Sequence, residues 1–77
     1  MEKLPQLSGQ EVIKALRKVG FEVVGRKGSH IRLKRRVNNK VFIVIVPDHP
    51  ELAKGTLTAI IKQSGLSREE FLKLIKG

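Results

Sequence analysis

The stretch Phe21–Val46, FEVVGRKGSHIRLKRRVNNKVFIVIV, decides the fold. At its centre, Ile31 and Leu33 alternate with polar residues, which is the pattern of a strand that buries one face. Two turn signals divide the stretch. Lys27-Gly28-Ser29 contains a glycine that accepts positive φ, and Asn38-Asn39 suits a primed two-residue turn. We therefore expect three antiparallel strands, over residues 21–26, 30–36 and 41–46.

Helix signals flank these strands on both sides. Ser8-Gly9-Gln10-Glu11 has the Ser-x-x-Glu form of a capping box, and it predicts a helix from Gly9 to Val19 that stops at Gly20. A second helix is expected to begin near Gly55, with Thr56 as its N-cap, and to stop at Gly65. A second capping box, Ser67-Arg68-Glu69-Glu70, predicts a short last helix.

This order of elements predicts an α+β fold with the sequence α-β-β-β-α. A three-stranded antiparallel meander carries helices on one face, and a short extra helix follows at the C-terminal end. The same layout is found in the double-stranded RNA-binding domain. Because 77 residues are close to the lower limit for one hydrophobic core, residues 1–77 are expected to form a single domain.

The composition excludes several functional classes. The chain has no cysteine, so disulfides, thiolate zinc sites and a cysteine nucleophile are ruled out. With 2 histidines and 7 carboxylates we expect no metal site, and the small core leaves no room for a deep cofactor pocket. No segment has the apolar length of a signal peptide core or a membrane span. We expect a soluble cytoplasmic protein that does not bind membranes.

Positive charge is concentrated on the predicted sheet. The formal net charge is +9, and the segment from Val23 to Pro47 contains no acidic residue. Its cations are Arg26, Lys27, Arg32, Lys34, Arg35, Arg36 and Lys40. A one-signed patch attracts polyanions and releases their counterions, which favours a nucleic acid or an acidic protein as partner. The alternative is a solvated face that only aids solubility.

His30 is the candidate catalytic residue. It follows the Gly28-Ser29 turn and faces the same side as the cations of its strand, so that a neutral imidazole beside RNA can remove the proton of a ribose 2′-hydroxyl. The expected RNA-binding residues are Lys27, Gly28, Ser29, Arg32, Lys34 and Arg36. His49 is a candidate second proton carrier. Each histidine also has a non-catalytic interpretation. His30 would then contact only phosphate or its own turn, and His49 would be a structural residue of its loop.

The third predicted strand raises a separate question. Val41, Ile43 and Ile45 point to one side and Phe42, Val44 and Val46 to the other, so both faces are apolar. A meander makes this an edge strand, and an exposed apolar edge promotes aggregation. Either helices and loops of the chain cover it or a partner protein does.

Several segments resemble the HicA (YcfA-like) family of mRNA interferase toxins. They are Ser8–Ile13 with Leu16, Gly20-Phe21, Lys27–His30, Val44–Pro47 with His49, and Gly55–Leu57 continuing into Ile60–Leu66. The resemblance covers roughly residues 8–72. It implies the double-stranded RNA-binding fold and cleavage of mRNA without metal or other cofactor, with His30 as the catalytic histidine. It also implies a cognate HicB-like antitoxin that covers the active face, and a monomeric free toxin. The segment Arg32–Lys40 is more basic than the family pattern.

Two other functions remain open from the residues. A non-catalytic RNA-binding module of the same fold would use the cations but not the chemistry of His30. A protein-protein adaptor would use them to bind an acidic partner.

Overall fold

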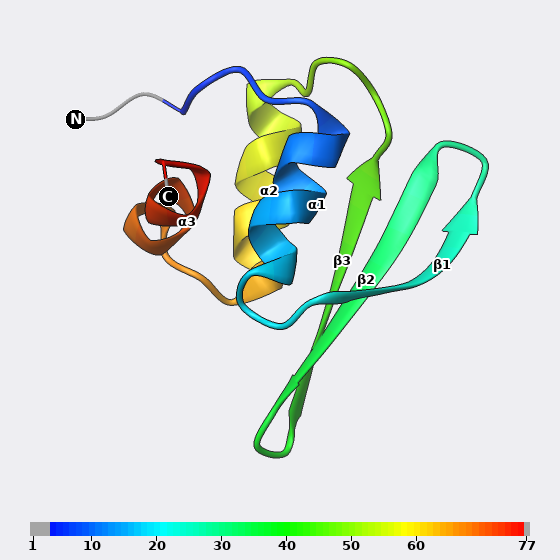
Figure 1. The fold of residues 1–77 in the computed structure, drawn as a ribbon, viewed down its shortest axis with the longest axis vertical. Coiled ribbons are helices and arrows are strands. Elements are labelled where there is room, and N and C mark those ends of the chain that lie inside the picture. Colours follow the sequence, from blue (N-terminus) through cyan, green and yellow to red (C-terminus); the bar gives the residue numbers. More distant parts are fainter. Residues whose placement is uncertain (1–3, 77) are drawn as a thin grey trace.

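The structure of the protein is a computed structural model that describes residues 4–76 (Figure 1). Its elements, in chain order, are α1 (Gly9–Arg17), β1 (Glu22–Lys27), β2 (His30–Val37), β3 (Lys40–Pro47), α2 (Lys54–Ser64) and α3 (Arg68–Lys76). The strands form one antiparallel sheet in the order β1-β2-β3. The predicted α+β class, the meander and the extra C-terminal helix are therefore confirmed.

Both predicted hairpin turns are present. Lys27 pairs with His30 across Gly28-Ser29, and Gly28 has a φ of +60°. Val37 pairs with Lys40 across Asn38-Asn39, and Asn38 has a φ of 55°. The strand bounds differ from the predicted ones by one residue: β1 is Glu22–Lys27 rather than 21–26, and β2 and β3 extend to Val37 and over Lys40–Pro47. Positive φ at one position of each turn lets the chain reverse within two residues.

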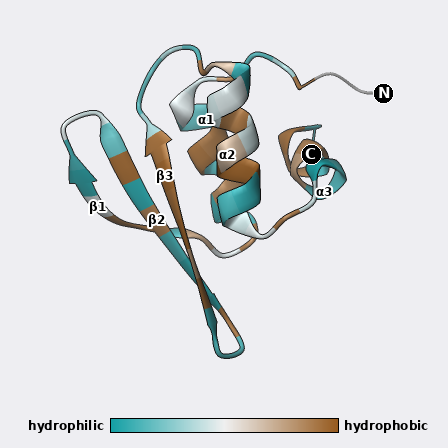
Figure 2. Cartoon of the chain, turned by 180° about the vertical axis from the view of Figure 1, so that it is seen from behind, coloured by the Kyte–Doolittle hydropathy of each residue, from teal (hydrophilic) through white to brown (hydrophobic). Residues whose placement is uncertain are grey.

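The strands bury one face against the helices. Ile31, Leu33, Val44 and Val46 are at most 5% exposed, as the alternation predicted for β2. The core is completed by α1 and α2, and α3 packs on the far side of these helices with Phe71 fully buried (Figure 1). Figure 2 shows the alternation of polar and apolar residues along β2 and the continuous apolar character of β3. No helix of residues 4–76 covers the opposite face of the sheet.

The capping boxes at the starts of α1 and α3 are confirmed. The Glu11 amide donates to Ser8 Oγ at 3.1 Å, and the Ser8 amide donates to Glu11 Oε1 at 3.0 Å. Ser67 and Glu70 exchange the same pair of hydrogen bonds at the start of α3, at 3.0 and 3.1 Å. Each box satisfies backbone donors that the first helical turn leaves without an intrahelical partner.

The predicted N-cap of α2 is wrong. The helix begins at Lys54 with Ala53 as the N-cap and no side-chain cap, so Thr56 lies inside the first turn. The preceding chain explains the earlier start: buried Leu52 donates its amide to the Leu7 carbonyl at 2.8 Å and fixes the backbone just before the helix. At the other end Gly65, with a φ of 76°, stops α2 as predicted.

Helix α1 ends at Arg17, two residues before the predicted Val19. The C-cap is Lys18 in the right-handed helical region, so Gly20 is not the helix stop that the sequence predicted. Gly20, with a φ of 101°, instead lies at the end of the turn that follows the helix. The Phe21 amide donates to the Leu16 carbonyl at 3.2 Å, which leads the chain directly into β1. In the part of the chain from 4 to 76, no helix is long and apolar enough to cross a membrane.

Candidate active site

The helix-free face of the sheet carries the predicted site residues. His30 starts β2 and lies between Lys27 of β1 and Pro47 of β3. Directly opposed residues share a face of an antiparallel sheet, and so does every second residue along a strand. Arg32, Lys34 and Arg36 therefore lie on the face of His30, and all three are exposed. The structure thus brings Lys27, His30 and the three cations of β2 together on one open face.

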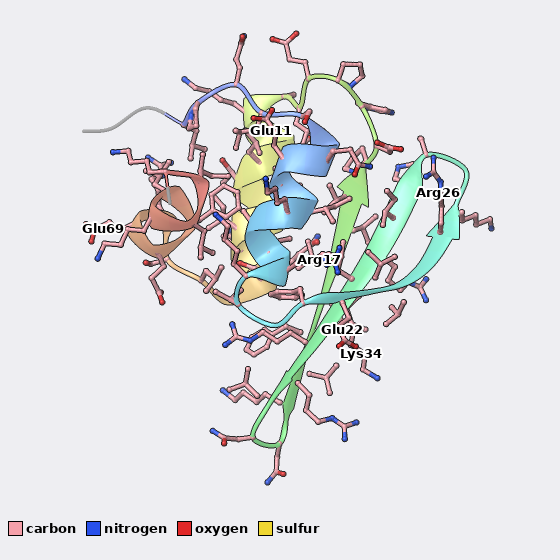
Figure 3. The ribbon with its side chains drawn as sticks, in the orientation of Figure 1. Glu11, Arg17, Glu22, Arg26, Lys34 and Glu69 are labelled. Atoms are coloured by element: carbon pink, nitrogen blue, oxygen red, sulfur yellow. The ribbon has the colours of Figure 1, made fainter. Side chains whose placement is uncertain are left out.

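One acidic residue on this face was missed by the sequence analysis. Glu22 lies opposite Lys34 in the β1-β2 register, and Figure 3 shows the two side chains at the same place on the sheet. Glu22 stands one residue before the acid-free segment, so only the strand register could have placed it beside a cation. Positive charge without an opposed acid is therefore concentrated at the other end of β1, around Lys27 and Arg32.

A shallow hollow lies at that end of the open face. It has a volume of about 510 Å³ and is lined by Gly25, Arg26, Lys27, His30, Arg32 and Ile45. Gly25 contributes no side chain, and a Cβ placed there would meet no atom within 4 Å. The His30 side chain is exposed, and no hydrogen bond or ion pair with another of residues 4–76 holds its imidazole. The imidazole is thus accessible to a bound ligand.

The turn before His30 is held by hydrogen bonds to both of its carbonyl groups. Arg26 Nε donates to the Gly28 carbonyl at 2.9 Å, and the Asp48 amide donates to the Ser29 carbonyl at 2.6 Å. An ion pair of 3.1 Å between Arg26 Nη2 and Asp48 Oδ2 joins these two donors. The position of His30 at the start of β2 therefore depends on a clamp formed by Arg26 and Asp48.

The clamp is itself attached to α1. Gln10 Nε2 donates to the second oxygen of the Asp48 carboxylate, Oδ1, at 3.0 Å. This hydrogen bond, followed by the nearby Arg26 guanidinium, lowers the pKa of Asp48 below its ordinary value of 3.8. Asp48 therefore stays ionised near neutral pH and keeps Arg26 in place.

Sequence reasoning did not identify Gln10, Arg26 and Asp48 as a unit. Gln10 and Asp48 are 38 positions apart, and no local pattern connects them. The one available signal was the single acid, Asp48, that follows directly on the long basic segment.

His49 lies in an exposed position of the loop after β3. Its carbonyl accepts a hydrogen bond from the Gly9 amide at 2.9 Å, so the loop is tied to the start of α1. The preceding residue, Asp48, ties the same loop to the turn before His30. The loop of His49 thus adjoins the turn of His30, while a role of the His49 side chain in proton transfer stays a prediction.

Within the stretch from 4 to 76, no three His, Cys, Asp or Glu side chains gather in a group able to hold a metal ion. At the hollow, the polar side chains that the open face offers to a ligand are the imidazole of His30 and the cations Arg26, Lys27 and Arg32, and the backbone amides of the Gly28-Ser29 turn lie next to them. This set suits a ligand with negative charge and with a hydroxyl group that can be deprotonated.

A comparison with protein families finds a match to a family model described as "HicA toxin of bacterial toxin-antitoxin", over residues 9–66. This range runs from the first residue of α1 to just past the end of α2, and it contains the whole sheet. It therefore includes each candidate site residue named above. A comparison with curated proteins finds no match.

Proposed function

Because the chain belongs to the HicA family of toxins from bacterial toxin-antitoxin systems, we propose that it is an endoribonuclease that cleaves mRNA with His30 as its catalytic residue. The observation that carries this proposal is the position of His30. The imidazole is exposed in a hollow whose other polar side chains are the cations Arg26, Lys27 and Arg32. RNA supplies the two features that such a hollow suits, a chain of phosphates and a hydroxyl group beside each of them.

The proposed reaction begins with proton transfer to His30. The neutral imidazole takes the proton of a ribose 2′-hydroxyl, and the 2′-oxygen attacks the adjacent phosphorus. The bond from phosphorus to the 5′-oxygen breaks, which leaves a 2′,3′-cyclic phosphate and a 5′-hydroxyl. The leaving 5′-oxygen takes a proton from the His30 imidazolium, or from His49 if that side chain acts as the second proton carrier.

The charge that develops on the phosphoryl oxygens is stabilised by the neighbours of His30. Lys27 lies directly opposite His30 in the sheet, and Arg32 lies two residues further along the same face. The Ser29 amide is fixed in position because it shares a peptide plane with the Gly28 carbonyl, which accepts a hydrogen bond from Arg26. Preorganised donors of this kind lower the barrier most when they need no rearrangement during the reaction.

The cations of β2 also bind the phosphates of flanking nucleotides. Arg32, Lys34 and Arg36 are spaced by about 7 Å along β2, two residues of extended chain each. Contacts to phosphate position RNA without reading its sequence. Lys34 and Arg36 are therefore assigned to affinity and His30 to chemistry, while Arg32, which lies next to His30, contributes to both.

A cognate antitoxin completes the proposed function. Membership of a toxin-antitoxin family supports such a partner, and the basic open face favours one with acidic side chains. In this proposal the antitoxin covers His30 and the cations of β2, and so excludes RNA. The free toxin acts as a monomer on RNA.

Digestion of RNA in excess EDTA tests this proposal against that of a non-catalytic RNA-binding module. Two substrates of the same sequence are compared, one of RNA and one fully 2′-O-methylated. We expect both to bind, only the first to be cleaved, and its products to carry 5′-hydroxyl groups. Binding of both substrates without cleavage would favour the rival function. Cleavage of both would exclude the 2′-oxygen as nucleophile, and cleavage that disappears in EDTA and returns with a divalent cation would contradict the metal-free reaction.

A further inference from the structure

We propose that the outer edge of β3, at Val41 and Ile43, is a pairing site for an extended acidic segment of a partner protein. The segment adds to the sheet as a fourth strand beside β3. The inference rests on the proposed function only where it identifies this partner as the antitoxin. The edge itself is defined by three features of the structure, which are its backbone groups, its exposed side chains and the charge beside it.

The backbone groups of Val41 and Ile43 point away from the sheet. The amide of Ile45 donates to Gln63 Oε1 of α2 at 3.2 Å, so Ile45 turns its backbone outward from β2. In an antiparallel pair this orientation alternates from residue to residue, and Ile43 and Val41 therefore share it. Among residues 4–76, no hydrogen bond engages the outward groups of these two residues.

The C-terminal end of the same edge is closed. Pro47 has no amide hydrogen, and Gln63 occupies the amide of Ile45. Natural proteins block edge strands in this way to prevent unwanted pairing. Neither of these two groups reaches Ile43, so the open segment of the edge lies at Val41 and Ile43.

The side chains of the open segment are apolar and exposed. Val41 is 45% exposed and Ile43 48%, and they stand next to each other on the helix-free face of the sheet. Neighbouring exposed apolar side chains on an edge strand are a recurring feature of surfaces that bind a protein partner. An added strand buries both side chains and supplies hydrogen-bond partners for the backbone beside them.

Charge decides which kind of strand fits. Lys34 lies directly opposite Ile43, and Arg36 lies opposite Val41. An added strand would run about 10 Å from β2, a distance that long lysine and arginine side chains span together with a carboxylate. Glutamates on the open face of the added strand therefore reach these cations across the smaller Val41 and Ile43. A second copy of this chain would bring the same cations together, with a net charge of +9 on each copy.

Strand addition would also explain how a partner blocks the proposed RNA site. The carboxylates of the added strand use the cations of β2 that RNA phosphates need, so the two ligands compete. The antitoxin then inhibits through Lys34 and Arg36 as well as by covering His30.

The direct test uses a synthetic peptide of four Val-Glu repeats with blocked ends, and the full protein. On binding, we expect amide hydrogen exchange to slow at Val41 and Ile43, whose amides become hydrogen-bonded, and to stay unchanged at Val44, which already pairs within the sheet. A Val-Lys repeat should not bind, and a peptide of glutamates alone should bind more weakly without protecting these amides. Binding of the Val-Glu peptide without protection of Val41 and Ile43 would overturn the proposal.

Two variants at one position separate strand pairing from simple surface contact. Ile43→Ala removes the apolar side chain and keeps the amide, whereas Ile43→Pro removes the outward amide as well and leaves the pairing with β2 intact. We expect the proline variant to bind the peptide about tenfold more weakly than the alanine variant, the effect of about one hydrogen bond. Equal affinities of two folded variants would contradict strand addition.

The outcomes for strand addition, for the proposed function and for self-association are distinct. Peptide binding does not require RNA cleavage, so strand addition and the proposed function can fail separately. Sedimentation of the wild-type protein tests whether a second copy of this chain, rather than an acidic segment, occupies the edge of β3. A concentration-dependent dimer that Ile43→Pro abolishes would assign the edge to a second copy of this chain and overturn the acidic partner.

Discussion

Asp48 connects three parts of the molecule that meet beside His30. Its amide binds the turn before β2, and its carboxylate binds Arg26 at the end of β1 and Gln10 at the start of α1. None of these contacts touches the imidazole of His30. Asp48 is therefore a positioning residue, which acts through the turn.

The substitution Asp48→Asn tests this role. Asparagine loses the ion pair with Arg26, so the turn should move and kcat for RNA cleavage should fall by about 10- to 100-fold. KM should change little because the cations of β2 remain. The matched control is Glu51→Gln, an exposed acid three positions further along the loop that changes the net charge equally. Similar kinetics for both variants would show that Asp48 acts only through its charge.

Gly9, at the start of α1, lies against the backbone at the end of β3. A Cβ at Gly9 would collide with the Pro47 carbonyl oxygen, whereas a Cβ at Gly55, in the first turn of α2, would meet no atom within 4 Å. Gly9→Ala should lower the free energy of unfolding by about 1–3 kcal/mol. Gly55→Ala should raise it by about 0.5–1 kcal/mol, since alanine favours the helix. Urea unfolding measures both. An increase in both variants would mean that the contact at Gly9 is not tight.

At the scale of elements, β2 separates two functions by the alternation of its side chains. Ile31 and Leu33 hold the strand on the core, and Arg32 and Arg36 are directed to the open face. Because the two sets point in opposite directions, cations on the open face can be replaced without loss of packing.

The double substitution Arg32→Gln with Arg36→Gln should change the salt dependence of RNA binding. Each phosphate contact contributes about 0.7 to the slope of log K against log salt concentration for single strands, so the slope should become shallower by about 1.4. The control is Lys62→Gln with Lys73→Gln, which removes the same charge from exposed positions on α2 and α3. Equal changes in the two double variants would exclude β2 as the RNA-binding strand.

Local signals allowed the sheet, both turns and both capping boxes to be predicted from the sequence. The alternation of β2 and the Gly28 and Asn38 turns depend on residues that are neighbours in the chain. The start of α2 could not be predicted in this way, because the contact of Leu52 with Leu7 sets it from outside the helix.

The candidate site was predictable only in part. The open-face position of His30 and the cations followed from alternation alone. The opposition of Glu22 to Lys34 and the clamp at Asp48 depend on strand register and on contacts between distant segments. The open edge at Val41 and Ile43 likewise required the positions of α2 and Gln63.

At the scale of the whole molecule, the hairpin of β1 and β2 extends beyond the helices (Figure 1). Val23 and Val24 of β1 are 51% and 52% exposed, so burial contributes little to holding this strand. Its attachment to the rest of the molecule comes from pairing with β2 and from the contacts of Arg26 with Asp48. The β1 side of the site is thus held by polar contacts more than by the core.

The contacts of two carboxylates, Asp48 at the site and Glu70 at the start of α3, predict how the free energy of unfolding depends on pH. Gln10 and Arg26 lower the pKa of Asp48 from 3.8, and hydrogen bonds with Ser67 lower that of Glu70 from 4.5. A lowered pKa in the folded state means that the stabilisation is fully present above these ordinary values and is lost as the pH falls through the folded values. Stability should therefore decline below about pH 5.

Urea unfolding between pH 7 and pH 3 measures this decline. The double variant Asp48→Asn with Glu70→Gln should show a flatter dependence over that range than the wild-type protein. A control pair, Glu51→Gln with Glu69→Gln, removes two exposed acids of the same elements and should keep the wild-type slope. A wild-type slope in the first variant would contradict the part assigned to Asp48 and Glu70.

The role of His30 can be measured as the rate of RNA cleavage by His30→Ala relative to the wild-type protein, in single-turnover reactions with excess EDTA. Loss of a general base costs about 10²- to 10⁴-fold. We expect a decrease in that range with RNA affinity nearly unchanged, since the phosphate-binding cations remain. Cleavage by His30→Ala at the wild-type rate would contradict the assignment of His30 as the catalytic residue.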